Sequence, residues 1–131
     1  MSSDPTAVFR ALSDETRLTI IALLLSHGEL CGCEFEEVLG ITQSKTSRHL
    51  RYLLNTGLVR DRRVGASIYY RIGEDVPPST LSILQSAPSL LNETRLADLR
   101  EQIREFQAVR CSAVQSERQT VGGAAKAGAD R

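Results

Sequence analysis

Three cysteine side chains are the strongest candidates for binding a ligand in this chain of 131 residues. Cys31 and Cys33 are separated by a single glycine, and Cys111 lies far downstream. An odd number of cysteines argues against a framework of disulfide bonds. Thiols held close together in a reducing compartment are typical of a site for a soft metal or metalloid ion, or of a redox-active pair.

The spacing of the cysteine pair suggests how ligand binding changes the backbone. In a regular helix, residues i and i+2 point about 200° apart. Cys31 and Cys33 therefore cannot converge on one small ion while the segment is helical. Gly32 makes a non-helical conformation inexpensive. We expect ligand binding to unwind or displace the start of a helix predicted over residues 29–39.

Apolar periodicity and turn residues predict a mostly α-helical domain with one β-hairpin. The predicted helices are 5–12, 15–26, 29–39, 42–55, 79–86 and 92–110, and the predicted strands are 58–63 and 67–72. We expect one domain over residues 1–110 and a flexible tail over 111–131, which becomes rich in Gly and Ala. The sequence shows no apolar run of membrane-spanning length and no signal peptide, so we expect a cytoplasmic protein that does not bind a membrane.

The stretch TQSKTSRHLRYLLN, residues 42–55, predicts an amphipathic helix with one buried and one basic face. On a helical wheel, Thr46, Leu53 and Leu54 fall on the same side as Leu50 and form the buried stripe. The net charge of the chain is zero, yet residues 43–71 carry seven Lys or Arg against one Asp, a local charge of +6. A basic patch of this kind indicates a surface that binds a polyanion.

The turn Gly40-Ile41-Thr42 joins this helix to the preceding one, which predicts a helix-turn-helix, and the hairpin that follows predicts a wing. The first part of the second helix would meet base edges in the major groove of double-stranded DNA, and the wing would reach the sugar-phosphate backbone or the minor groove. The expected DNA-binding residues are Gln43, Ser44, Lys45, Ser47, Arg48, His49 and Arg51 in the helix, and Arg62 and Arg63 in the wing.

The last predicted helix carries a short apolar stripe. Leu96, Leu99, Ile103 and Phe106 step by three or four residues, as at the a and d positions of a coiled coil. The stripe predicts the seam of a homodimer formed through terminal helices. The alternative is that it packs on the winged domain of the same chain.

The stretch LGITQSKTSRHLRYLLNTGLVRDRRVGASIYYRI, with ALSDETRLTIIALL upstream, resembles the winged helix-turn-helix of the ArsR/SmtB family of metal-responsive repressors. The resemblance covers residues 9–72. It implies a homodimer that binds a two-fold operator and represses transcription until an inducer binds.

The segment Glu29-Leu30-Cys31-Gly32-Cys33-Glu34 is similar to the motif E-L-C-V-C-D-L-C of the arsenic-sensing branch, but Glu36 replaces its third cysteine. The resemblance implies that Cys31 and Cys33 bind a trivalent inducer, which is arsenite, methylarsenite or antimonite, without an organic cofactor. Two thiolates would complete the coordination of a methylated arsenic(III). Alternatively, Cys111 supplies a third thiolate from the same chain or its partner.

Other functions remain open at this point. A thiol redox sensor of the same fold would oxidise the two cysteines instead of binding a metalloid. An enzyme is not expected, because the chain contains no phosphate-binding Gly loop, no C-x-x-C in a βαβ context and no Ser/His/Asp arrangement. A pure protein-interaction module would leave the basic helix and the wing without a role.

Overall fold

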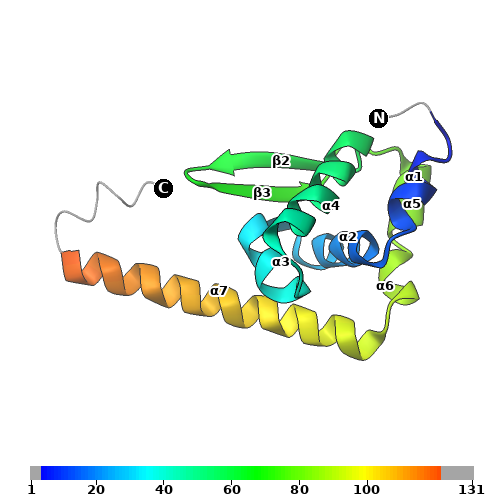
Figure 1. Cartoon of the computed structure of the whole chain (residues 1–131). Helices are drawn as coiled ribbons and strands as arrows, with labels where there is room; N and C mark the ends of the chain where they lie inside the picture. The colour runs from blue at the N-terminus through cyan, green and yellow to red at the C-terminus, as the bar shows by residue number, and fades with distance from the viewer. Residues whose placement is uncertain (1–3, 122–131) are drawn as a thin grey trace.

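The computed structural model describes the backbone of residues 4–121 and the side chains of residues 4–110. The elements are α1 (Ala7–Leu12), α2 (Glu15–His27), β1 (Glu29–Cys31), α3 (Gly32–Leu39), α4 (Gln43–Thr56), β2 (Val59–Val64), β3 (Ser67–Ile72), α5 (Pro78–Leu84), α6 (Ala87–Leu90) and α7 (Glu93–Val121). A hairpin of β2 and β3 extends from the helical body, and α7 runs beneath α2 and α3 (Figure 1). The predicted fold class, mostly α-helical with a β-hairpin wing, is confirmed.

Local capping defines the helix-turn-helix as predicted. The hydroxyl of Thr42 accepts a hydrogen bond from the backbone N–H of Lys45 at 3.2 Å and so caps α4. Gly40, between α3 and α4, has a φ of 72°, which is the left-handed region that L side chains avoid. Gly57 ends α4 in the same region with a φ of 82°. These residues therefore fix where α3 ends and where α4 begins and ends.

The segment before α3 differs from the prediction. Residues 29–31 form a third strand instead of the first turn of a helix, and β1 pairs antiparallel with β3 in a sheet of order β1-β3-β2. Leu30 is fully buried, and it lies opposite Tyr70 on β3, while Cys31 lies opposite Tyr69. Leu30 is buried in the core, and residues 29–31 form hydrogen bonds with β3. These two interactions outweigh the helical tendency of this three-residue segment. The wing is thus joined by hydrogen bonds to the segment that carries the first cysteine.

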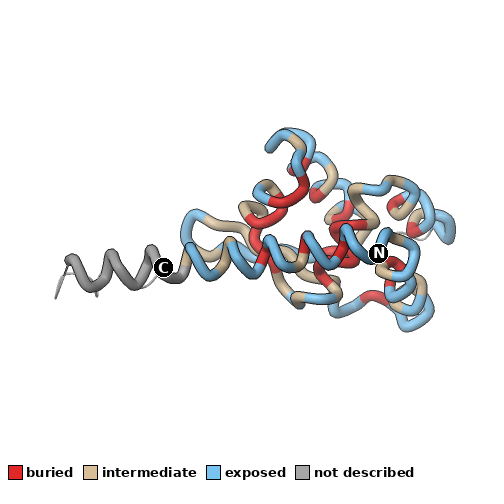
Figure 2. Tube along the Cα trace, turned by 90° about the horizontal axis from the view of Figure 1, so that it is seen from below, coloured by how far each residue is buried: buried red, intermediate tan, exposed pale blue. Residues whose placement is uncertain are grey.

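The first half of α7 packs on its own chain. Leu96, Leu99 and Ile103 are buried in the core that α2, α3 and α4 share, and the buried positions of α7 recur along one side of the helix (Figure 2). Phe106 is half buried. The stripe predicted as a dimer seam therefore serves intramolecular packing, which was the alternative.

The same helix is longer than predicted. It was expected to end at residue 110 but continues to Val121, and residues 122–131 of the expected tail lie outside the described part of the chain. Within residues 4–121, none of the helices has the length and hydropathy needed to cross a lipid bilayer.

His27, the last residue of α2, is held where its charged form is disfavoured. Its Nε2 atom is buried without a hydrogen-bond partner. Burial lowers the pKa of His27 from its ordinary value of 6.5, and the nearby charges of Arg104 and Arg100 lower it further, while Glu34 opposes them. The neutral imidazole is therefore the form that the fold accommodates.

We expect His27→Asn to reduce the acid sensitivity of the fold. The pKa of His27 is lower in the folded state than in the unfolded chain, so the unfolded chain binds a proton more readily. The stability that neutral His27 contributes is therefore complete above pH 6.5, and it is lost as the pH falls from 6.5 through the lowered pKa of the folded state. Urea unfolding of the parent and the variant at several pH values measures the effect. The free energy of unfolding should fall less steeply in the variant below about pH 6.5. Equal slopes would show that His27 is not desolvated in solution.

Candidate ligand site and nucleic-acid interface

Cys31 and Cys33 lie together at the junction of β1 and α3. Cys31 is the N-cap of α3, with an extended backbone (φ −76°, ψ 149°), and its sulfur accepts a hydrogen bond from the backbone N–H of Cys33 at 3.2 Å. Cys31 is therefore outside the helix, and the premise that both cysteines are helical is wrong. The expectation that the helix must unwind before both cysteines bind one ion loses its basis.

A buried carboxylate completes the start of α3. Glu34 is 1% exposed, and its Oε1 accepts the backbone N–H of Cys31 at 2.6 Å, forming a capping box. Its Oε2 accepts from Nε2 of Gln107 at 2.6 Å and from Nη2 of Arg110 at 3.1 Å. These two partners come from α7, so Glu34 connects the cysteine segment to the C-terminal helix.

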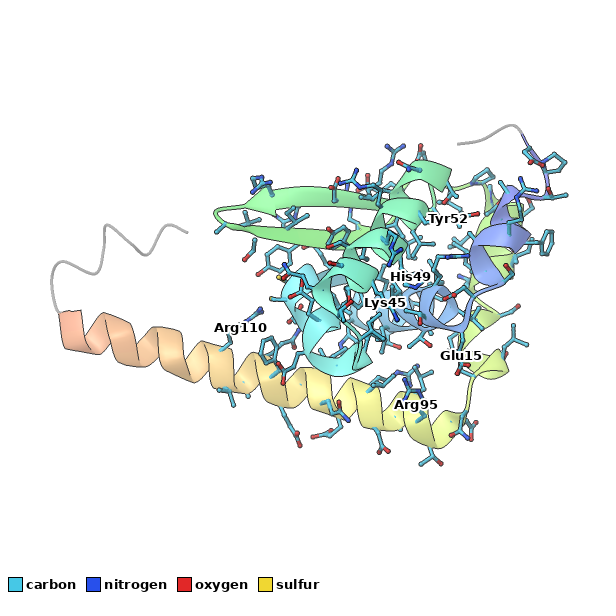
Figure 3. The ribbon with its side chains drawn as sticks, in the orientation of Figure 1. Glu15, Lys45, His49, Tyr52, Arg95 and Arg110 are labelled. Carbon is cyan, nitrogen blue, oxygen red and sulfur yellow. The ribbon has the colours of Figure 1, made fainter. Side chains whose placement is uncertain are left out.

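Arg110 also contacts the cysteine pair directly. Its Nη1 lies 2.8 Å from Sγ of Cys33, and its guanidinium lies 5.3 Å from the ring centroid of Phe106. Figure 3 shows Arg110 on the side of α7 that faces α3. One guanidinium therefore touches both a candidate ligand sulfur and the buried carboxylate beside it.

Burial raises the pKa of the Cys33 thiol to about 12, and the hydrogen bond and charge of Cys31 act in the same direction. The charge of Arg110 acts in the opposite direction. A peroxide-sensing cysteine requires a lowered pKa, because the thiolate is the species that reacts. The environment of Cys33 therefore does not favour the redox alternative.

Cys31 and Cys33 offer two sulfur donors, which suit a soft ion. Among the described side chains, no group of three or more His, Cys, Asp or Glu residues is arranged to hold a metal ion. Glu36, at the third position of the arsenic-sensing motif, is a hard oxygen donor and half buried. The side chain of Cys111 lies outside the described residues, although its backbone continues α7 after Arg110. Cys31 and Cys33, at the start of α3, are thus the candidate ligands among the described side chains.

The outward face of α4 is exposed as the helical wheel predicts. Thr46, Leu50 and Leu53 are buried, and Leu54 is half buried. The exposed residues of the predicted DNA-binding set on this helix are Gln43, Ser44, Lys45, Ser47, Arg48 and Arg51. Polar and basic side chains at the start of such a helix can donate to base edges and phosphates. The structure therefore brings these six predicted residues onto one accessible surface.

His49 differs from the rest of that set because it turns toward the protein. It is half buried, and its Nδ1 lies 3.3 Å from Nη1 of Arg17 and 3.9 Å from a carboxylate oxygen of Asp14. The guanidinium of Arg17 also stacks 4.1 Å from the ring centroid of Tyr52. His49 thus fastens α4 to the start of α2 (Figure 3). It lines a hollow beside Lys45 at the edge of the basic surface.

The two wing arginines have different surroundings. Arg62 donates two hydrogen bonds of 2.8 Å to the carboxylate of Glu29 on β1, and its guanidinium lies 5.7 Å from the ring centroid of Tyr69. Arg63 is exposed on β2. The structure therefore leaves Arg63 facing solvent, whereas Arg62 stabilises the contact between the wing and β1.

Glu34, Gln107 and Arg110 were not predicted as site residues. One signal was available, because Ile103, Gln107 and Arg110 continue the buried stripe of α7 in steps of four and three. Polar residues on a core-facing stripe require a buried partner. The position of that partner, 73 residues before Gln107, is not readable from helical periodicity.

Comparison with known proteins places this geometry among bacterial regulators. The profile described as "Bacterial regulatory protein, arsR family" matches residues 14–61. The arsenic resistance transcriptional regulator ArsR2 of Pseudomonas putida (strain KT2440) is 44% identical over 81 residues, which are 62% of this chain and 70% of the relative. The arsenical resistance operon repressor of Escherichia coli (strain K12) is 41% identical over 83 residues, 63% of this chain and 71% of the relative. The crystal structure of the antimony-specific transcriptional repressor AntR matches with a TM-score of 0.54 and 25% identity, over 72% of this chain and 96% of AntR.

Proposed function

Because this chain belongs to the ArsR family of bacterial regulatory proteins, whose members are DNA-binding regulators and not enzymes, we propose that it represses transcription from a two-fold operator. It releases the operator when a trivalent arsenic or antimony compound binds Cys31 and Cys33. The observation that carries the proposal is the position of the cysteine pair at the start of α3, the helix that precedes the exposed basic helix α4.

The ligand class follows from the number of thiols and from relatives. Of the three similar proteins named above, two are named for arsenic resistance and one is named as antimony-specific. Arsenite, methylarsenite and antimonite exchange hydroxyl groups for thiol sulfur, and each exchange releases water. The thiol proton leaves with the hydroxyl, so the raised pKa of Cys33 does not prevent binding.

Two connections lead from the cysteine pair to the DNA-binding elements. Cys31 ends β1 and lies opposite Tyr69 of the wing strand β3, and Cys33 lies in the first turn of α3, which packs on α4. Movement of either sulfur toward a shared ion would therefore displace the wing, α3 or both. The inducer acts by binding the displaced conformation more tightly than the DNA-bound one, as linkage requires.

A two-fold operator requires two copies of the chain, and we propose that terminal helices join them. Phe9 on α1 and Val109 on α7 are 57% and 68% exposed, so both helices carry apolar surface that the described chain does not cover. The wing arginine Arg63 and the exposed face of α4 would then be presented twice to one duplex.

Operator release is the direct test. The DNA is a fluorescent duplex that carries the site selected by the protein from a random-sequence library. We expect two chains per duplex, and we expect a fall in fluorescence anisotropy on titration with arsenite, methylarsenite or antimonite. Cys31→Ser and Cys33→Ser should bind the duplex as the parent does but should lose release by at least about tenfold in inducer concentration, because a hydroxyl does not replace a thiolate for a soft ion.

Two further additions complete the test. Peroxide releases the operator only if the thiol redox alternative is correct, so we expect no release by peroxide. Zinc and cadmium test whether the site instead serves divalent cations. Unchanged release from both serine variants would refute the assignment of the inducer site, and failure of the parent to select any duplex would refute the repressor function.

A further inference from the structure

The cysteine pair provides two sulfur ligands, whereas arsenite has three hydroxyl groups that can exchange. The guanidinium of Arg110 lies beside the pair, with Nη1 at 2.8 Å from Sγ of Cys33. An atom bonded to this sulfur at about 2.3 Å, a typical metal–thiolate distance, lies within about 5 Å of Nη1 of Arg110. A substituent on that atom is thus within reach of the guanidinium.

The guanidinium is held in place by contacts that a bound ligand need not disturb. Nη2 of Arg110 donates to Glu34 at 3.1 Å, and the ring of Phe106 lies beside the same group. Glu34 is itself fixed by Gln107 and by the backbone of Cys31. Nη1 can therefore turn from the sulfur to a neighbouring acceptor while Nη2 stays bound. An arginine donor suits a hydroxyl or oxyanion oxygen and has nothing to bond on a methyl group.

We propose that arsenite keeps one hydroxyl when it binds Cys31 and Cys33, and that Arg110, in place of a third thiolate, donates a hydrogen bond to that oxygen. The inference rests on the proposed function and specifies its ligand as an inorganic trivalent hydroxide. It makes Arg110 a specificity-determining residue that favours arsenite over methylarsenite.

The exchange balances without a redox partner. Two As–O bonds of As(OH)₃ break and two As–S bonds form. The two thiol protons leave with the two hydroxyl groups as water, and arsenic remains trivalent. The product is a dithiolate of arsenic with one hydroxyl, whose oxygen accepts the hydrogen bond from Nη1 of Arg110.

X-ray absorption of the arsenite complex of the unaltered protein tests the coordination directly. We expect two sulfur atoms and one oxygen around arsenic, and the same set in Cys111→Ser. Three sulfur atoms, reduced to two in Cys111→Ser, would overturn the proposal in favour of a third thiolate. No arsenic bound at all would refute the proposed function and this inference together, whereas three sulfur atoms would refute the inference alone.

Equilibrium dialysis with arsenite and with methylarsenite tests the role of Arg110. Arg110→Leu should weaken arsenite binding by about tenfold, as expected for loss of one charge-assisted hydrogen bond, and should change methylarsenite binding by less than about threefold. Arg104→Leu is the matched control, because Arg104 is exposed on α7 and pairs with Glu101 at 2.8 Å. It should leave both ligands unaffected.

The ratio of the two affinities separates specificity from a structural role. An equal loss for both ligands in Arg110→Leu would show that Arg110 only supports the fold, and no loss for either would show that it does not contact the ligand. If Arg110→Leu does not fold, Arg110→Lys retains a cationic donor, and it should preserve part of the preference for arsenite. The proposal would also be overturned if Arg110→Lys bound methylarsenite as tightly as the parent does but no longer preferred arsenite over methylarsenite.

Discussion

Glu34→Ala is expected to lower the free energy of unfolding by about 2–4 kcal/mol. The carboxylate is 1% exposed and accepts hydrogen bonds from the backbone of Cys31 and from two side chains of α7, Gln107 and Arg110. Its removal leaves a buried N–H, a side-chain amide and a guanidinium without their acceptor. It also removes the capping box of α3 and the polar link between α3 and α7, so two elements lose stability together.

Equilibrium urea unfolding at a fixed chain concentration measures this loss, because association would make the midpoint depend on concentration. Glu34→Gln keeps the shape and one acceptor oxygen and should lose less. Glu37→Ala removes an exposed carboxylate from the same helix and should stay within about 0.5 kcal/mol of the parent. A similar small effect for Glu34→Ala would mean that the network around Glu34 does not form in solution.

Local patterns were sufficient to predict the DNA-binding part of the fold. The buried stripe of Thr46, Leu50 and Leu53 follows from the period of a helix, and Thr42 and Gly57 mark its ends by capping chemistry alone. Each of these signals acts within a few residues. The predictions for α4 and the hairpin are therefore confirmed with boundaries close to those observed.

Predictions were wrong where distant residues decide the local structure. Leu30 adopts a strand because β3, about 40 residues later, offers an edge to pair with. The stripe of α7 was compatible with either a dimer or an intramolecular core, and burial of Ile103 against the same chain decides between them. The contact of Arg110 with Cys33 joins residues 77 apart. Such pairings depend on the three-dimensional arrangement and leave no periodic signal in the sequence.

Arg48→Ala is expected to weaken operator binding by roughly 30-fold or more, because a bidentate contact of arginine with a base contributes about 1–3 kcal/mol and the substitution occurs in both half-sites. Arg48 lies on the exposed face of α4, whereas the buried residues of this helix are Thr46, Leu50 and Leu53. Truncating its side chain to alanine therefore creates no cavity in the core. Fluorescence anisotropy with the selected operator duplex, at several salt concentrations, measures the loss.

The salt dependence shows which kind of contact Arg48 makes. A phosphate contact reduces the slope of log affinity against log salt by about one unit for each arginine removed, and weakens binding to all sequences alike. A base contact weakens the selected operator more than a scrambled duplex. Arg95→Ala, which removes the same charge from the exposed surface of α7, should leave both properties unchanged. If Arg95→Ala lost as much operator affinity as Arg48→Ala, Arg48 would contribute only through the net charge of the protein. If Arg48→Ala bound the operator as tightly as the parent, Arg48 would not contact the DNA.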